Sequence, residues 1–130
     1  MKPFGITVDG VWYSVHVEYE SLKRAFEIVE GRNSGTMLTG RQTRDVLGTG
    51  YSYSMTIQPD PSDPESYDAL YEVLSAPTAS HMVTLPYGQG TITFEAMIES
   101  GEDVYSGTLG GKKRWSGLEI SFRFVQPYRV

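Results

Sequence analysis

The chain contains no cysteine in its 130 residues. This absence excludes a disulfide framework, a thiolate metal site and a cysteine nucleophile, and it agrees with a reducing cytosol. Long apolar runs are also missing, since no stretch approaches the roughly 20 residues that cross a bilayer. The first ten residues, MKPFGITVDG, lack the apolar run of a secretion signal. We therefore expect an unexported chain without a membrane partner.

Positive charge is scarce. The 11 Lys and Arg residues stand against 16 Asp and Glu residues, which gives a net charge of −5. This is the wrong sign for a protein that coats a phosphate backbone, so we expect no specific nucleic-acid binding. The 14 glycines and nine tyrosines are typical of turns and aromatic strands. The length predicts a single domain over residues 1–130.

One helix is predicted, at about 64–75. Asp63 can cap its first N–H groups, Pro64 suits the first helical position, and Pro77 prevents continuation. Apolar residues recur with helical spacing at Tyr67, Leu70, Tyr71 and Leu74. A single helix of about three turns is marginal in water, so it must pack on the strands around it.

The rest of the chain alternates apolar and polar residues, as half-buried strands do. The alternation is clearest at 51–57, 92–98 and 118–124, and Asp9-Gly10 predicts the turn of a hairpin over 6–17. Residues 19–29 suit a short helix or a strand, and we favour a strand. We expect a mainly β (α+β) fold, an antiparallel β-sandwich or partly open barrel of about seven to nine strands with the helix packed on it.

The segment from Gly31 to Gly50 has five glycines around two short apolar pairs, Met37-Leu38 and Val46-Leu47. Glycine at this density favours left-handed backbone and weak burial. The segment is therefore predicted to be a long exposed loop or an extended hairpin. Long loops in compact domains usually have a function.

Motifs for catalysis are incomplete. Neither His16 nor His81 has a partner at metal-ligand spacing, and 50–54 lacks the last glycine of a nucleophile elbow. The glycines and lysines of 107–113 are one residue short of a phosphate loop. The carboxylates at 60–68 are explained by helix capping rather than by calcium. We expect no catalytic residue, no metal and no cofactor.

The two tryptophans, Trp12 and Trp115, are the candidate aromatic binding or interface residues. Indole rings stack on sugar rings, and they also fill cores and protein interfaces.

Several short segments carry a resemblance to a known class of proteins. They are Arg24-Ala-Phe26-Glu27, Gly31 to Gly35, Arg44-Asp45 before Gly48-Thr49, Tyr67-Asp68-Ala69-Leu70, and Trp115-Ser-Gly117-Leu with Arg123 and Gln126-Pro127. With the strand–helix–strand order, the chain resembles small structural proteins of prophages in Gram-positive bacteria, and it is similar to bacteriophage tail-tube and baseplate proteins.

The resemblance implies a non-enzymatic subunit that forms homo-oligomeric rings, commonly hexamers, and contacts other tail proteins. Such a subunit is made in the cytoplasm of the bacterial host and ends in the virion tail. Sheet edges would join neighbours, and a long loop would reach the next ring. The residues that we assign to this assembly loop are Arg32, Asn33, Met37, Leu38, Arg41 and Arg44.

Elementary chemistry agrees with one part of this hypothesis, because open sheet edges leave N–H and C=O groups that a second copy can pair. An acidic lumen would also let DNA slide without sticking. Two other functions stay open. The chain could be a small binding module that holds a carbohydrate or peptide through Trp12, Trp115 and loop tyrosines, or an enzyme that uses His16 or His81.

Overall fold

The computed structural model describes residues 5–31, 35–36, 40 and 42–129. Within these residues it contains one helix and eleven strands. In chain order they are β1 (Ile6–Val8), β2 (Val11–Tyr13), β3 (Val15–Val17), β4 (Lys23–Glu30), β5 (Gly35–Thr36), β6 (Gln42–Thr43), β7 (Val46–Pro59), α1 (Pro64–Leu74), β8 (His81–Tyr87), β9 (Gly90–Met97), β10 (Gly101–Leu109) and β11 (Lys112–Phe124).

Nine of these strands form one antiparallel sheet that is nearly closed into a barrel. The strand order is β2-β1-β8-β9-β11-β7-β3, with β4 paired to β7 and β10 paired to β11. The first and last strands of this path, β2 and β3, are consecutive in the chain and separated only by Ser14. The predicted class, a mainly β fold with a partly open barrel and one helix, is therefore confirmed.

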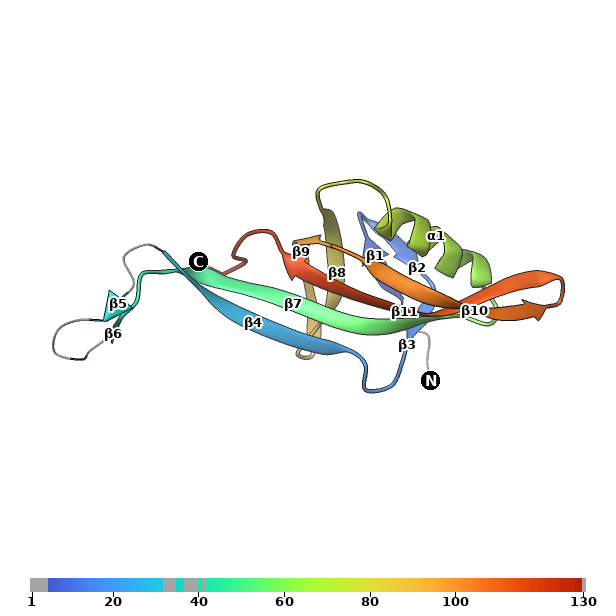
Figure 1. The fold of residues 1–130 in the computed structure, drawn as a ribbon, viewed down its shortest axis with the longest axis horizontal. Coiled ribbons are helices and arrows are strands. Elements are labelled where there is room, and N and C mark those ends of the chain that lie inside the picture. Colours follow the sequence, from blue (N-terminus) through green and yellow to red (C-terminus); the bar gives the residue numbers. More distant parts are fainter. Residues whose placement is uncertain (1–4, 32–34, 37–39, 41, 130) are drawn as a thin grey trace.

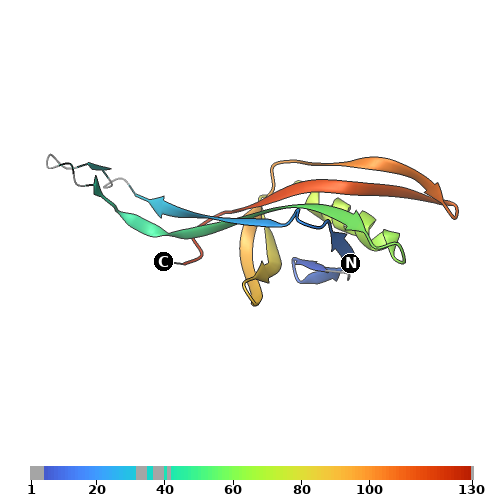
Figure 2. The same ribbon diagram turned by 90° about the horizontal axis from the view of Figure 1, so that it is seen from below.

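Two long strands run through the middle of the molecule. β7 has 14 residues and β11 has 13, and they pair from Leu118↔Ile57 to Arg123↔Ser52. Each strand continues beyond this shared stretch in a different direction. β7 leaves the barrel paired with β4 at one end, and β11 leaves paired with β10 at the other, so two ribbons project from the body (Figures 1 and 2).

The core lies inside the curved sheet and follows the alternation in the sequence. Every second side chain of the central strands is buried, which stabilises the fold by roughly 2 kcal/mol for each large apolar side chain. The buried set includes Tyr51, Tyr53, Met55 and Ile57 on β7, Leu118, Ile120, Phe122 and Phe124 on β11, and Val83, Leu85, Ile92, Phe94 and Ala96 on β8 and β9.

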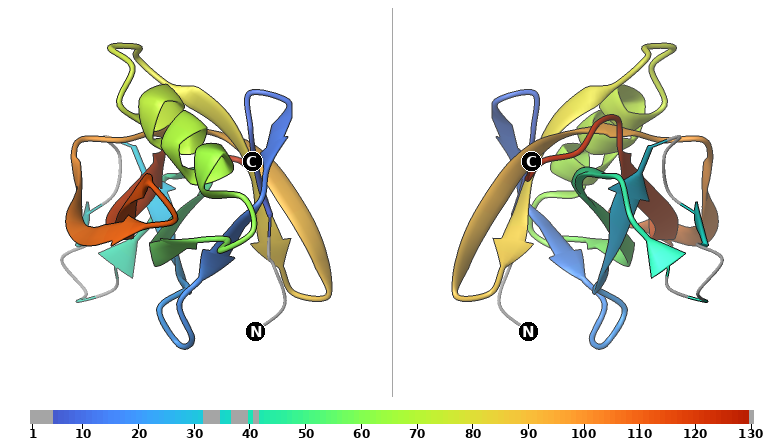
Figure 3. Two further views of the ribbon diagram at one scale, coloured as in Figure 1. Left: turned by 90° about the vertical axis from the view of Figure 1, so that its right-hand side faces the viewer. Right: turned by 90° about the vertical axis from the view of Figure 1, so that its left-hand side faces the viewer.

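Helix α1 lies across one side of the barrel, as the end-on views show (Figure 3). The Asp63 side chain accepts a hydrogen bond from the Ser66 N–H at 3.2 Å, as an N-cap should. Tyr67, Leu70 and Leu74 are buried against the strands, which confirms the predicted apolar face, whereas Tyr71 remains partly exposed. The Tyr67 hydroxyl donates a hydrogen bond to Asp103 on β10 at 2.9 Å. Burial and this carboxylate raise the pKa of Tyr67.

The predicted N-terminal hairpin is correct only as far as Tyr13. β1 and β2 pair from Ile6↔Tyr13 to Val8↔Val11, but the chain then breaks at Ser14 and β3 pairs with β7 instead. The Ser14 N–H donates to the Ser66 hydroxyl and the Ser14 hydroxyl donates to Asp60, both at 2.8 Å. One continuous strand over 11–17 is therefore a wrong prediction, because polar contacts at the start of the helix hold Ser14 inward.

The described strands between Gly31 and Gly50 pair as in an extended hairpin. Residues 46–50 belong to β7 and pair with β4, from Glu27↔Gly50 to Glu30↔Val46. The short pair β5–β6 lies further along the same ribbon. The strand prediction for 19–29 is confirmed over β4. The loop interpretation fails for 46–50 because Gly48 and Gly50 are buried by the C-terminal part of the chain.

A polar contact fastens the β1–β2 turn to β8. The His81 ring, which is only 6% exposed, donates from Nδ1 to the Asp9 carboxylate at 2.7 Å. The same carboxylate accepts the Met82 N–H at 2.9 Å. The His81 hydrogen bond, followed by the Met82 N–H, lowers the pKa of Asp9. Asp9 has φ +52°, a backbone region that Asp and Asn tolerate better than other side chains.

The close approach of Gly50 to Phe124 gives a first prediction. A Cβ at residue 50 would overlap the Phe124 ring, so Gly50→Ala should lower the free energy of unfolding by about 1–3 kcal/mol. Gly90→Ala is the control, because its Cβ would lie 3.9 Å from the nearest atom, the Tyr87 carbonyl oxygen. Urea unfolding measures both variants. Equal stabilities would show that the β7–β11 packing is misplaced.

The Asp9–His81 contact predicts a pH dependence. A carboxyl whose pKa is lowered by folding stabilises the fold at pH values above its unfolded pKa of about 3.9. That stability is lost as the pH falls through the lower, folded pKa. Asp9→Asn keeps an acceptor for the Met82 N–H but removes the charge. We expect a less stable protein at pH 7 and a smaller further loss on acidification, measured by urea unfolding from pH 7 to pH 2.

Asp68→Asn, on the exposed side of α1, is the control for this experiment. If the free energy of unfolding changed with pH in the same way for Asp9→Asn and the wild type, the assignment of this pH dependence to Asp9 would be contradicted.

Candidate assembly surface

The outermost strands of the extended sheet are β4 and β10. β4 pairs with β7 and β10 pairs with β11, and in the described part of the chain neither has a second partner. β4 lies beside residues 46–54 of β7 and β10 beside residues 112–120 of β11, so the two open edges are on opposite sides of the β7–β11 pair and towards its opposite ends. Unpaired edges are templates for the addition of another strand. The two edges belong to different ends of the sequence and lie on opposite sides of one sheet.

Large apolar side chains are exposed on both open strands. Phe26 on β4 is 71% exposed, and Val104 and Leu109 on β10 are 66% and 68% exposed. By contrast, the central parts of β7 and β11, residues 51–57 and 118–124, bury their apolar residues in the core. Exposed apolar groups at two open edges are typical of surfaces that another protein covers.

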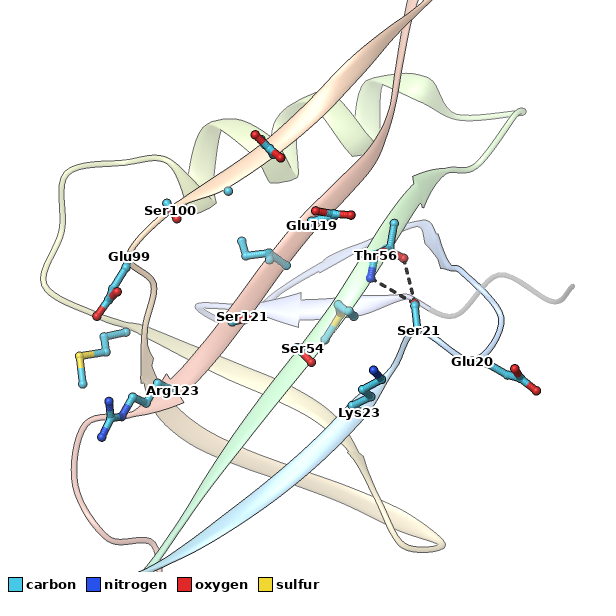
Figure 4. A pocket seen from close by; sticks show the side chains of 15 residues that line it. Glu20, Ser21, Lys23, Ser54, Thr56, Glu99, Ser100, Glu119, Ser121 and Arg123 are labelled. Carbon is cyan, nitrogen blue, oxygen red and sulfur yellow. Dashed lines mark hydrogen bonds between the residues drawn. The ribbon is translucent and has the colours of Figure 1, made fainter.

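The outward face of this sheet is polar. An open groove of about 840 Å³ crosses β7 and β11 (Figure 4). Five short hydroxyl side chains line it, together with the apolar Met55, Met97 and Ile120: Ser21, Ser54, Thr56, Ser100 and Ser121. Four carboxylates and two cations also line it: Glu20, Glu99, Glu102 and Glu119, with Lys23 and Arg123. The charged lining is therefore acidic on balance.

Two of these carboxylates, Glu102 on β10 and Glu119 on β11, are direct cross-strand partners. Like charges directly opposite each other destabilise a sheet. Neither carboxylate has an ion pair among the described residues. The chain therefore keeps negative charge at a place where stability alone favours a neutral or oppositely charged pair.

The candidate tryptophans lie on different elements. Trp12 is on β2 and covers the backbone at Gly5, whereas Trp115 is on the β10–β11 ribbon and packs against Tyr105 with ring centroids 5.1 Å apart. Both rings remain exposed, and no described contact joins them. Trp115 and Tyr105 thus form an aromatic pair beside an open edge, while Trp12 belongs to another part of the surface.

Most of the predicted assembly-loop residues lie outside the described residues: Arg32, Asn33, Met37, Leu38 and Arg41. Arg44 is described, and its guanidinium forms an ion pair with Glu30 across the β4–β7 ribbon. This contact assigns Arg44 a role in the ribbon itself.

The two histidines are held by carboxylates. His16 Nε2 lies 3.9 Å from Asp60. His81 connects Asp9 to the Thr78 hydroxyl, which lies 3.2 Å from Nε2. A hydroxyl–imidazole–carboxylate chain can move a proton, but acyl transfer also needs donors for an oxyanion. The adjoining end of α1 presents carbonyl groups, which disfavour negative charge. We therefore interpret the hydrogen bonds that join Thr78, His81 and Asp9 as a structural contact.

The part of the chain that the structure describes offers neither a metal centre nor a membrane-spanning helix. No group of three or more His, Asp or Glu side chains in this part of the chain could hold a metal ion. None of the helices in it is long and apolar enough to cross a membrane.

The open edges were not predicted individually from the sequence. The alternation of β4 is weak because its residues are mostly exposed, and β10 contains two irregularities, between Glu102 and Val104 and between Tyr105 and Gly107. In the sequence, the open edges are indicated only by the mixed charged and aromatic residues of these two strands, which show no clear buried side.

Comparison with known proteins gives no family for this chain. Neither a protein-family model nor a curated protein sequence matches it.

Proposed function

We propose that the chain is a non-enzymatic structural subunit of a phage or prophage tail, of the tail-tube or baseplate class, which assembles into rings. The observation that carries this proposal is that β4 and β10, on opposite edges of one sheet, each have a single strand partner among the described residues. Two different edges on one subunit permit head-to-tail contacts, and such contacts generate rings when the rotation closes.

The strand directions support the same geometry. β4, β7, β11 and β10 are antiparallel in succession, so β4 and β10 themselves run in opposite directions. When β10 of one copy lies beside β4 of the next, the antiparallel alternation continues across the contact without interruption. Every copy would thus add four strands to a common sheet, and the exposed Phe26 and Val104 would be covered at the junction.

The polar face fits the inside of such a ring. Its carboxylates outnumber its cations and would repel a polyanion. An acidic lining therefore suits a channel through which DNA slides. The two facing glutamates, Glu102 and Glu119, would contribute negative charge to the channel lining in this arrangement. In an isolated domain their charges only repel each other.

A binding module remains the second candidate function. The exposed Tyr105–Trp115 pair offers an aromatic platform for a sugar or peptide. The two irregularities in β10 also favour it, because bulges are a device that keeps an open edge from pairing. The oligomeric state separates the two functions.

Variants at the two edges test the assembly. Phe26→Lys places a charge on the β4 edge and Val104→Lys places one on the β10 edge, and both native residues are exposed, so folding should survive. We expect rings for the wild type and monomers for each variant, measured by size exclusion with light scattering and by negative-stain microscopy. Met82→Lys is the control, because β8 already has partners on both sides.

Mixing the two variants identifies which edges meet. Each variant keeps one intact edge, so a head-to-tail contact predicts dimers and nothing larger in an equimolar mixture. A symmetric contact, β4 with β4 or β10 with β10, predicts dimers of a single variant instead. A wild type that stays monomeric at high concentration would overturn the proposal and favour the binding module.

The facing glutamates give a second prediction, measured in the Phe26→Lys monomer. Glu102→Gln or Glu119→Gln should each raise the free energy of unfolding by about 0.2–1 kcal/mol at low salt, because each removes the repulsion. The double variant should gain less than the sum. Glu72→Gln on α1 is the control. Additive effects, or a gain that salt does not reduce, would contradict the like-charge interpretation.

A further inference from the structure

A cluster of phenols and guanidiniums lies where the β4–β7 ribbon leaves the barrel. The Tyr51 ring packs edge-on against Tyr87 and Tyr128, with centroids 5.3 and 6.0 Å away. The Arg24 guanidinium lies over the Tyr87 ring at 5.3 Å, and the Arg129 guanidinium faces the hydroxyls of Tyr51 and Tyr87. The five side chains come from β4, β7, β8 and the C-terminal segment, so only the folded chain brings them together.

Among the residues that the structure describes, neither guanidinium has a carboxylate partner. The side-chain ion pairs of the described residues leave Arg24 and Arg129 out, although the chain has a net charge of −5 and carboxylates are plentiful. Both side chains are exposed, so a ligand can reach them. The hydrogen bond from Tyr87, followed by that from Arg129, lowers the pKa of Tyr51. The positive charge of Arg24 acts in the same direction.

The Tyr51 hydroxyl can donate a hydrogen bond. Its oxygen accepts a hydrogen bond from the Tyr87 hydroxyl at 3.1 Å and faces Arg129, and no described residue accepts its own O–H. Tyr51 is only 7% exposed, so the packing around its ring fixes the position of the hydroxyl oxygen. A ligand that reaches the two guanidiniums can accept the hydrogen bond of this hydroxyl.

The C-terminal segment is held in place by the backbone. The Thr49 N–H donates to the Arg129 carbonyl at 2.7 Å, and the Tyr128 N–H donates to the Thr49 carbonyl at 2.8 Å. This pairing fixes the position from which the Arg129 side chain starts. Stacking on Tyr87 similarly fixes Arg24. The two cations are therefore partly preorganised, which lowers the entropy lost on binding a ligand.

From this geometry we infer an oxyanion-binding site formed by Arg24, Arg129 and the hydroxyl of Tyr51, with a phosphate dianion as its ligand. Guanidinium forks match the oxygen geometry of phosphate, and two cations balance two negative charges. A carboxylate carries one charge and leaves one guanidinium uncompensated. Arg24 and Tyr51 belong to the β4–β7 ribbon, whose open edge we propose as an assembly edge, so phosphate binding and assembly are tested separately.

Inorganic phosphate is the probe. Binding is measured by calorimetry and by the ultraviolet difference spectrum of tyrosine at about pH 8, where phosphate is mainly dianionic. Chloride and acetate at the same ionic strength serve as reference anions. We expect saturable binding of phosphate, a tyrosine signal that follows it, and no saturable response to acetate or chloride.

Matched variants locate the site. Arg24→Gln and Arg129→Gln should each weaken phosphate binding about tenfold, and Tyr51→Phe, which keeps the ring, should weaken it to a lesser degree. Arg123→Gln removes the same charge from a residue that lies beside Glu27, and it should change the affinity by less than about twofold. Circular dichroism confirms that each variant is folded.

No saturable phosphate binding by the wild type would overturn the inference. An equal loss in Arg24→Gln and Arg123→Gln would also overturn it, because it would show that only the net charge of the chain matters. Binding of acetate as strongly as phosphate would reject the dianion as the ligand. Repeating the titration with the monomeric Val104→Lys variant separates this site from assembly, because Val104 lies on β10 and away from Arg24, Tyr51 and Arg129. Saturable phosphate binding is expected from this variant although it forms no rings.

Discussion

The antiparallel pairing of β7 with β11 is the contact on which the rest of the structure depends. The paired stretch covers only residues 52–57 and 118–123, so each strand has a long remainder that leaves the barrel at a different end. Each long strand also has two shorter strands along its outer side, β3 and β4 on β7, and β9 and β10 on β11. One pairing thus fixes the barrel, both ribbons and both open edges.

The two faces of this strand pair have different chemistry, which follows from the period of two in a strand. The inner face carries Tyr53, Met55, Ile57 and their partners, and it supplies the hydrophobic stabilisation of the core. The outer face carries hydroxyls and carboxylates, with Glu102 opposite Glu119. A surface that keeps repulsive charge is understood more readily as a functional surface than as a stabilising one. The acidic lining of a channel is the use that we propose for it.

The fold class and most strands could be predicted because burial on one side of a sheet produces strict alternation. The pattern in 51–57, 92–98 and 118–124, and the cap and apolar spacing of 64–74, are local consequences of that burial. Prediction failed where the conformation of a residue depends on a contact with a residue far away in the sequence. Ser14 continues the alternation in the sequence, yet its contacts with Ser66 and Asp60 end the strand. Gly48 and Gly50 suggest a loop, yet they are glycines because the C-terminal segment and Phe124 leave no room for a Cβ.

The sequence by itself determined the secondary-structure periods, the single capped helix and the acidic balance, since each depends on residues near one another in the chain or on composition alone. The tertiary structure decided which strands have a free edge, that Glu102 faces Glu119, and that Arg24, Tyr51, Tyr87 and Arg129 meet. These are properties of strand register and of contacts between segments far apart in the chain. A local pattern does not determine the register between two strands. A shift of one strand by two residues keeps the same side chains buried but changes every cross-strand partner.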